Sequence, residues 1–176
     1  MFNSFRAHSF AFNFMPETSI HDHFMLEALK QAKIAFEKGE IPVGAVVVHQ
    51  NRIVGRAYNQ MEMLHDPTAH AEMIAMTQAS ETLSQGKEGH RGSLEGATIY
   101  VTLEPCCMCA GAMVVTKVKN LVYGTRDSRA GACESLYRIT QDDRLNHRLQ
   151  VVSGVRENDS KVFLQEFFRN LRKEKR

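Results

Sequence analysis

The 176-residue chain lacks long apolar runs, contains few cysteines and carries little net charge. No stretch reaches the roughly 20 apolar residues that a membrane-spanning helix needs, so we expect no membrane partner. Four cysteines, three of them within four positions, suit a bound metal better than a disulfide framework and favour a cytoplasmic location. A net charge of +2 does not by itself indicate a polyanionic partner, although residues 169–176 are strongly basic.

The composition is typical of one globular domain. With 43% hydrophobic and 24% charged residues, a chain of this length buries enough apolar surface to fold without disulfides. Residues 1–19 contain many Phe, but Arg, His, Ser and Asn interrupt any run that could serve as the apolar part of a signal peptide. We therefore expect a disordered extension over 1–19 and a single domain over 20–176.

Alternating helix and strand patterns predict the fold class. The polar segment 80–96 contains four glycines and is expected to be a surface loop. Strands that alternate with helices indicate an α/β protein in which a mixed five-stranded sheet is covered on both faces, a three-layer α/β/α sandwich. The expected helices are 21–38, 67–79, 105–117 and 159–173, and the expected strands are 43–48, 52–59, 97–104, 121–125 and 149–155.

Three cysteines follow Pro105 within four residues. On a helix that begins at Pro105, Cys106 and Cys109 share a face, whereas Cys107 points about 100° away and is expected to be a small buried residue. The start of a helix favours thiolates. Two thiolates and an imidazole suit zinc, and the third ligand that we predict is His70, near another helix started by a proline.

Three protein ligands leave a fourth position for water, which distinguishes a catalytic zinc from a structural one. Glu72 follows His70 by two residues and is the predicted general acid and base. Within a helix the two side chains would point about 200° apart, so we expect the ion to lie over the helix end. In the alternative interpretation, Glu72 only complements the positive end of the helix dipole.

H-x-E followed by P-C-x-x-C is the signature of zinc-dependent nucleobase deaminases. The stretches "GEIPVGAVVV", "HDPTAHAEM", "VTLEPCCMCAGAM", "YGTRD" and "FFRNLR" resemble, in this order, the bacterial tRNA-specific adenosine deaminases. The resemblance implies a cytidine-deaminase-like fold, a homodimer and one Zn²⁺ per subunit. It also implies that the wobble adenosine in the anticodon stem-loop of an arginine tRNA is converted to inosine, with release of ammonia.

The same resemblance implies roles for residues outside the metal signature. It implies that Asn59 and the backbone of Ala71 contact the base, although without the resemblance Asn59 is better explained as a turn residue. Arg126 and Asp127 either approach the RNA backbone or pair with each other on the surface. Three residues of the basic C-terminal helix are expected to contact tRNA: Phe168, Arg169 and Arg172.

Two other functions remain open from the sequence. A deaminase of free cytosine, cytidine or guanine would share the metal ligands and the acid/base residue, but a C-terminal helix rich in Phe and Arg suits an RNA backbone and has no use for a small substrate. A zinc-stabilised RNA-binding module without catalysis would need a fourth protein ligand, for which the candidates are His65, Cys107 and Cys133.

Overall fold

The computed structural model describes residues 19–85 and 91–174. All of the predicted extension except Ser19, which caps the first helix, lies outside these residues. No helix among the described residues is long and apolar enough to cross a membrane. The elements are α1 (Ile20–Glu37), β1 (Gly44–His49), β2 (Arg52–Tyr58), α2 (Met61–Leu64), α3 (Ala71–Ser84), β3 (Thr98–Leu103), α4 (Cys107–Val115), β4 (Asn120–Thr125), the 3₁₀ helix η1 (Ile139–Gln141), β5 (Gln150–Val152) and α5 (Glu157–Glu174).

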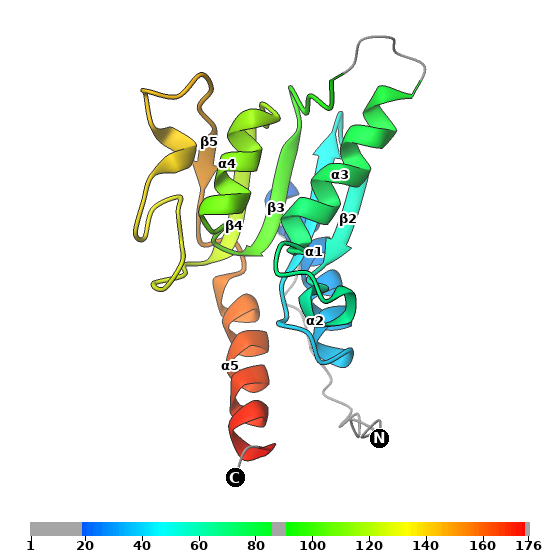
Figure 1. Cartoon of the computed structure of the whole chain (residues 1–176), viewed down its shortest axis with the longest axis vertical. Coiled ribbons are helices and arrows are strands. Elements are labelled where there is room, and N and C mark those ends of the chain that lie inside the picture. The colour runs from blue at the N-terminus through cyan, green and yellow to red at the C-terminus, as the bar shows by residue number, and fades with distance from the viewer. Residues whose placement is uncertain (1–18, 86–90, 175–176) are drawn as a thin grey trace.

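The five strands form one mixed sheet in the order β2-β1-β3-β4-β5 (Figure 1). Strand β1 is antiparallel to both of its neighbours, whereas β3, β4 and β5 are parallel to one another. The central strands are almost continuously apolar and buried, as expected of strands covered on both faces. The predicted mixed five-stranded sheet is therefore confirmed.

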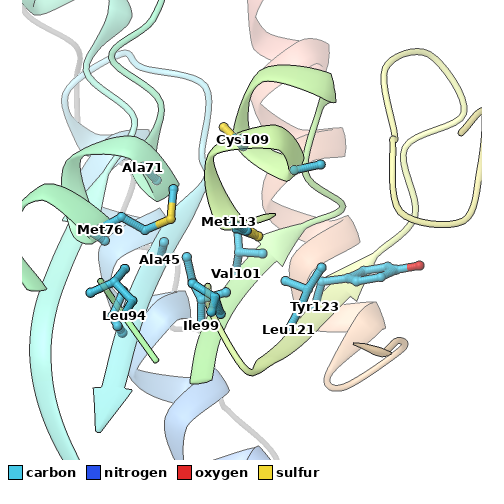
Figure 2. Packing of buried hydrophobic residues seen from close by; sticks show 14 of the residues in the cluster. Ala45, Ala71, Met76, Leu94, Ile99, Val101, Cys109, Met113, Leu121 and Tyr123 are labelled. Atoms are coloured by element: carbon cyan, nitrogen blue, oxygen red, sulfur yellow. The ribbon is translucent and has the colours of Figure 1, made fainter. Parts of the chain in front are cut away.

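Helices cover both faces of this sheet. Alternate residues of β1 belong to different cores: Ala45 and Val47 pack in the core under α3 and α4, and Val46 and Val48 pack in the core under α1 and α5. Figure 2 shows the first core, with Ala71 and Cys109 of the two helix starts at the same end of it. The three-layer sandwich is confirmed, and it brings the starts of α3 and α4 together.

Two glycines let helices lie directly on the sheet. A Cβ at Gly44 would overlap the backbone carbonyl oxygen of Ala28 in α1, and a Cβ at Gly55 would overlap that of Ala75 in α3. Because the obstructing atoms belong to helix backbone, a side chain at either position would push the helix away from the sheet. The position of α3, and of the residues at its start, depends on this close approach.

Both helices that were expected to start at prolines begin later in the chain. The carboxylate of Asp66 accepts hydrogen bonds from the backbone N–H and the hydroxyl of Thr68, which closes a turn around Pro67 in place of a helix cap. After Pro105, the next residue pairs with Gly131 in an isolated β-bridge and keeps an extended backbone. In both cases a local turn or a tertiary contact overrides the proline signal.

Other boundaries differ from expectation as well. Helix α3 continues to Ser84, so the expected loop over 80–96 begins later, and residues 86–90 of it lie outside the described part of the chain. The last strand is shorter than expected because Gly154, at φ 83°, turns the chain toward α5. The elements α2 and η1 were not predicted, since four and three residues are too few to display a helical period.

Candidate active site

The predicted zinc ligands lie at the starts of α3 and α4, just beyond the end of β3. His70 is the N-cap of α3 and Cys106 the N-cap of α4, and both have an extended backbone; Cys109 lies in the first turn of α4. Neither N-cap side chain makes a capping hydrogen bond to its own helix. The side chains that would ordinarily cap the two helices are thus available for another partner.

The three ligand atoms converge. The Nδ1 atom of His70 lies 3.6 Å from the Sγ of Cys106 and 3.5 Å from the Sγ of Cys109, and all three ligand atoms lie within 4.8 Å of one another. A tetrahedral ion with Zn–S near 2.3 Å and Zn–N near 2.0 Å requires an N···S separation of about 3.6 Å. The spacing and the donor set fit zinc, and the three residues form a zinc site of the kind typical of deaminases.

The two thiols are coupled by a hydrogen bond. Donation from Cys109 lowers the pKa of Cys106 to about 3, because the bond stabilises its thiolate. The same hydrogen bond, together with burial, raises the pKa of Cys109. The hydrogen bond to Cys106 in turn raises the pKa of His70. A bound dication would displace the thiol protons, so that both sulfurs would coordinate as thiolates.

Glu72 is the second residue of α3 and is only 4% exposed. Burial raises the pKa of its carboxyl group, which also interacts with the thiol of Cys109 and with His70. His70 precedes the helix, so the separation of about 200° that applies within a helix does not apply to this pair. A carboxylate that merely complemented the helix dipole would remain in water, whereas this one is buried beside the metal ligands.

Asn59 and Ala71 lie close to the ligands. Asn59 directly follows β2 and is 4% exposed; its Nδ2 donates a hydrogen bond to Oε2 of Glu40 at 3.2 Å. The neighbouring Gln60 donates its backbone N–H to the carbonyl of Ala69, which joins this segment to the one that precedes α3. Ala71 begins α3, where a backbone N–H has no partner within the helix.

The prediction that Cys107 is buried was wrong. Its side chain is exposed. Helix α4 begins one residue after Cys106, so Cys107 is its first residue and faces away from the sheet. Cys133 is buried, but its backbone N–H is bonded to Glu104 and its thiol lies near the carbonyl of Pro105. No fourth His, Cys, Asp or Glu among the described residues joins the three ligands, which leaves the structural zinc module without its required ligand.

Sequence reasoning missed Glu104, a 2% exposed carboxylate two residues before the first cysteine ligand. It holds the loop after β4, whose Gly131 pairs with Cys106. Its carboxylate accepts hydrogen bonds from the backbone N–H groups of Asp127, Cys133, Glu134 and Ser135 and from the hydroxyl of Ser135. The only available signal was a Glu at the end of an apolar strand, which does not identify its partners.

The residues expected to contact the RNA backbone are less closely connected to the metal site than Asn59, Ala71 and Glu104 are. Arg126 and Asp127 do not pair with each other: the guanidinium of Arg126 lies 3.4 Å from the carboxylate of Glu134, and the carboxylate of Asp127 accepts from the backbone N–H of Arg129. Figure 1 shows α5 extending past the edge of the sheet at which α3 and α4 begin. On this helix Phe168 and Arg172 are exposed and Arg169, also exposed, pairs with Glu166.

Comparison with known proteins identifies the family. Residues 19–172 match the family model described as MafB19-like deaminase. The chain is 46% identical over 153 residues to the tRNA-specific adenosine deaminase of Bacillus subtilis (strain 168), covering 87% of this chain and 91% of that protein. It is 41% identical over 151 residues to the enzyme of the same name from Aquifex aeolicus (strain VF5), covering 86% and 95%.

The chain belongs to the tRNA-specific adenosine deaminases. A solved structure from a study of A-to-I editing by tRNA:A34 deaminases at the wobble position of transfer RNA superposes on this deaminase with a TM-score of 0.74 at 41% identity, covering 81% of this chain and 99% of that one. A guanine deaminase from Nitrosomonas europaea, with a TM-score of 0.66 at 18% identity, shares the fold.

Proposed function

We propose that this deaminase hydrolyses the wobble adenosine of an arginine tRNA to inosine and ammonia, with Glu72 as its general acid and base. The observation that carries the proposal is the position of Glu72: a buried carboxyl group of raised pKa beside a His/Cys/Cys metal site. Membership of the tRNA-specific adenosine deaminases supports the reaction and the RNA substrate. The choice of an arginine tRNA rests on the resemblance of the sequence motifs.

In this proposal His70, Cys106 and Cys109 hold one Zn²⁺ per subunit. When bound, zinc lowers the pKa of water and so supplies a nucleophile for C6 of adenine at neutral pH. Glu72 accepts a proton from the attacking water and delivers it to N1 of the purine. The same carboxylate then takes the second proton of that water, from the hydroxyl now on C6, and delivers it to the exocyclic nitrogen, which leaves as ammonia while C6 becomes a carbonyl. Its burial keeps the proton between substrate and protein, because bulk water cannot exchange with a carboxyl group that it does not reach.

The base is held by Asn59 and by the backbone N–H of Ala71. Asn59 offers an amide at the end of β2, and Ala71 offers an unpaired donor at the helix start. An unstacked adenine of the anticodon loop enters between them, which requires little energy because loop bases are already unpaired. Exposed Phe168 and Arg172 on α5 supply a stacking surface and a phosphate contact farther along the RNA, with Arg169 and the segment 126–127 as further contacts.

A homodimer completes the proposal. Val115 at the end of α4 is 82% exposed, and Leu136 and Tyr137, in the loop after β4, are also exposed. Apolar side chains left in water on this scale favour contact with a second subunit. Light scattering coupled to size-exclusion chromatography measures the mass directly: a monomer at micromolar concentration would contradict this part of the proposal, and Val115→Glu should convert a dimer to monomer.

The experiment that tests the substrate is deamination of a synthetic arginine-tRNA anticodon stem-loop with adenosine at the wobble position. Free adenosine, free cytidine and a stem-loop from another tRNA are assayed in parallel with zinc-loaded protein. Inosine formed in the arginine stem-loop alone supports the full proposal. Turnover of a free nucleoside with the stem-loop untouched would overturn the substrate, and equal rates on both stem-loops would overturn the choice of tRNA.

The role of Glu72 is tested separately with Glu72→Gln. This variant should keep zinc, because the residue is not a ligand, and should lose at least about 10³-fold in kcat, in the range expected of a general acid and base. Zinc content is measured by atomic emission on the same sample. Activity retained within about tenfold of the unmodified enzyme would remove the acid/base assignment.

A further inference from the structure

Glu40 is the most deeply buried carboxylate that the proposed chemistry does not use, with 1% of its surface exposed. Its backbone is fixed by the end of α1: Gly39 adopts φ 76°, its N–H donates to Phe36, and the N–H of Glu40 donates to Ala35 at 2.9 Å. This is the Schellman pattern of a helix C-terminus. The pattern turns Glu40 inward, and nothing about capping α1 requires a carboxylate there.

The carboxylate of Glu40 joins two segments that border the candidate active site. Its Oε1 accepts the backbone N–H of Met63 at 2.7 Å, and its Oε2 accepts the backbone N–H of Glu62 at 3.3 Å and Nδ2 of Asn59 at 3.2 Å. Glu62 and Met63 belong to α2, while Asn59 directly follows β2. The carboxylate is therefore held in place by backbone donors, independently of the Asn59 amide.

This arrangement determines which end of the Asn59 amide faces the substrate. A carboxylate only accepts hydrogen bonds, so the NH₂ end of the amide must face Glu40. The reversed amide would bring its carbonyl oxygen against the carboxylate and leave two buried acceptors in contact. Oδ1 therefore points away from Glu40, and no described donor reaches it. Asn59 therefore presents its acceptor Oδ1 on the side away from Glu40, beside the second N–H of Nδ2.

We propose that Glu40 is a positioning residue for substrate recognition: it fixes the amide of Asn59 so that Oδ1 accepts a hydrogen bond from the bound adenosine. The inference rests on the proposed contact between Asn59 and the base. The acceptor end favours a nucleoside that presents an N–H or O–H at this point, and the 6-amino group and the 2′-hydroxyl of adenosine are such donors. Glu40 acts only through Asn59 and does not touch the reacting atoms.

The experiment is a double-mutant cycle measured as kcat/KM for the wobble-adenosine stem-loop, per zinc-loaded subunit. Glu40→Gln keeps the shape of the side chain but offers an NH₂ group, so that either orientation of Asn59 becomes possible. We expect Glu40→Gln to lower kcat/KM by up to about tenfold, the effect of one lost hydrogen bond to the substrate. In the Asn59→Ala background the same change should lower it less than about twofold, because no amide is left to orient.

The control is Glu104→Gln, the same substitution at another buried carboxylate that binds backbone N–H groups but does not contact Asn59. Its effect should be equal in both backgrounds. If Glu40→Gln also acts equally in both, or has no effect, Glu40 is only a structural residue and the inference is wrong. If Asn59→Ala itself leaves kcat/KM unchanged, the proposed contact of Asn59 with the base fails instead.

A second pair of variants tests the same contact with donor and acceptor exchanged across it. Asn59→Asp places a second carboxylate beside Glu40 and should lose activity and thermal stability. Combining it with Glu40→Gln exchanges donor and acceptor across the pair and still leaves an acceptor oxygen toward the substrate. We expect the double variant to recover at least about tenfold in kcat/KM over Asn59→Asp. No recovery would contradict the orientation of Asn59 by Glu40.

Discussion

Replacing Glu104 with Gln should destabilise the protein although the two side chains have nearly the same shape. One carboxylate oxygen of Glu104 accepts three backbone N–H groups, of Cys133, Glu134 and Ser135. The other accepts the N–H of Asp127 and the hydroxyl of Ser135. The most favourable glutamine orientation keeps the side-chain oxygen toward the three N–H groups and turns the NH₂ group toward Asp127 and Ser135. The hydroxyl of Ser135 can rotate to accept a hydrogen bond from this NH₂ group. The backbone N–H of Asp127 is a donor and loses its acceptor.

The magnitude follows from these contacts. One backbone donor left without an acceptor in a buried position costs about 2 kcal/mol. The three remaining hydrogen bonds lose the charge of their acceptor, at about 0.5 kcal/mol each. We therefore expect Glu104→Gln to lower the free energy of unfolding by about 3 to 4 kcal/mol. Zinc affinity should also fall, because the loop that Glu104 holds pairs with the ligand Cys106 through Gly131.

The assay is urea denaturation of the zinc-loaded protein at pH 7, with zinc affinity measured by competition with a chelator. Glu95→Gln, the same substitution at an exposed site, is the control and should change neither quantity. A loss below about 1 kcal/mol for Glu104→Gln would show that the loop is held by other contacts and would refute the reasoning.

The same substitution should change the response to acid. Although burial alone would raise it, the hydrogen bonds from Ser135, Glu134 and Asp127 hold the pKa of Glu104 below its ordinary 4.5. A depressed pKa contributes stability that is complete above 4.5 and is lost as the pH falls through the folded-state value. The stability difference between the unmodified protein and Glu104→Gln should therefore narrow below that pH; a constant difference would contradict the assignment.

Three further predictions concern the ligands and the packing of the helices. Cys106→Ser should reduce bound zinc, measured by atomic emission, to less than about a tenth of the stoichiometric amount, while the exposed Cys107→Ser should bind zinc normally. Removing zinc with a chelator should lower Tm by more than about 5 °C, and readdition should restore it. Gly111→Ala, which would meet no neighbouring atom, should raise the free energy of unfolding by about 0.5 to 1 kcal/mol, whereas Gly44→Ala should lower it by about 3 kcal/mol or more because α1 must move off the sheet.

The parts of the fold that were predictable are those determined by local periodicity. The apolar run Val43–Val48 can be covered on both faces only in the interior of a sheet, and β1 lies second in the strand order. The three-to-four spacing of Ala28, Ala32 and Ala35 defines one buried face of α1 in the same way. In both elements the apolar residues all contribute to one periodic pattern, and the structure formed is the one that this pattern predicts.

Hydrogen-bond partners distant in sequence were not predictable. Glu40 and Asn59 are nineteen residues apart, and Glu104 and Ser135 are thirty-one apart. A carboxylate in an apolar stretch indicates that some donor must compensate its burial, but only the topology of the sheet selects the donor. The prediction that Cys107 is buried failed for a related reason. The helix starts later than predicted, and this shift changes which side chains face the sheet.

The same shift explains why the ligand spacing nevertheless worked. Cys106 and Cys109 are the N-cap and third residue of α4, the two positions that form the capping box of many other helices. His70 is likewise an N-cap, and Glu72 follows as the second residue of α3. Residues at these positions face the axis of the helix start, where unpaired N–H groups favour anions. P-C-x-x-C and H-A-E therefore place thiols and an imidazole at positions that a capping hydroxyl or carboxylate ordinarily occupies, although neither N-cap side chain makes a capping hydrogen bond to its own helix. A metal bound to them would connect two helix starts that the sheet has already placed side by side.

This geometry predicts that Cys109→Asp, which keeps an anion in the first turn of the helix, preserves more thermal stability in the zinc-free protein than Cys109→Ala. Equal melting temperatures of the two zinc-free variants would contradict the stabilisation of an anion at the start of the helix.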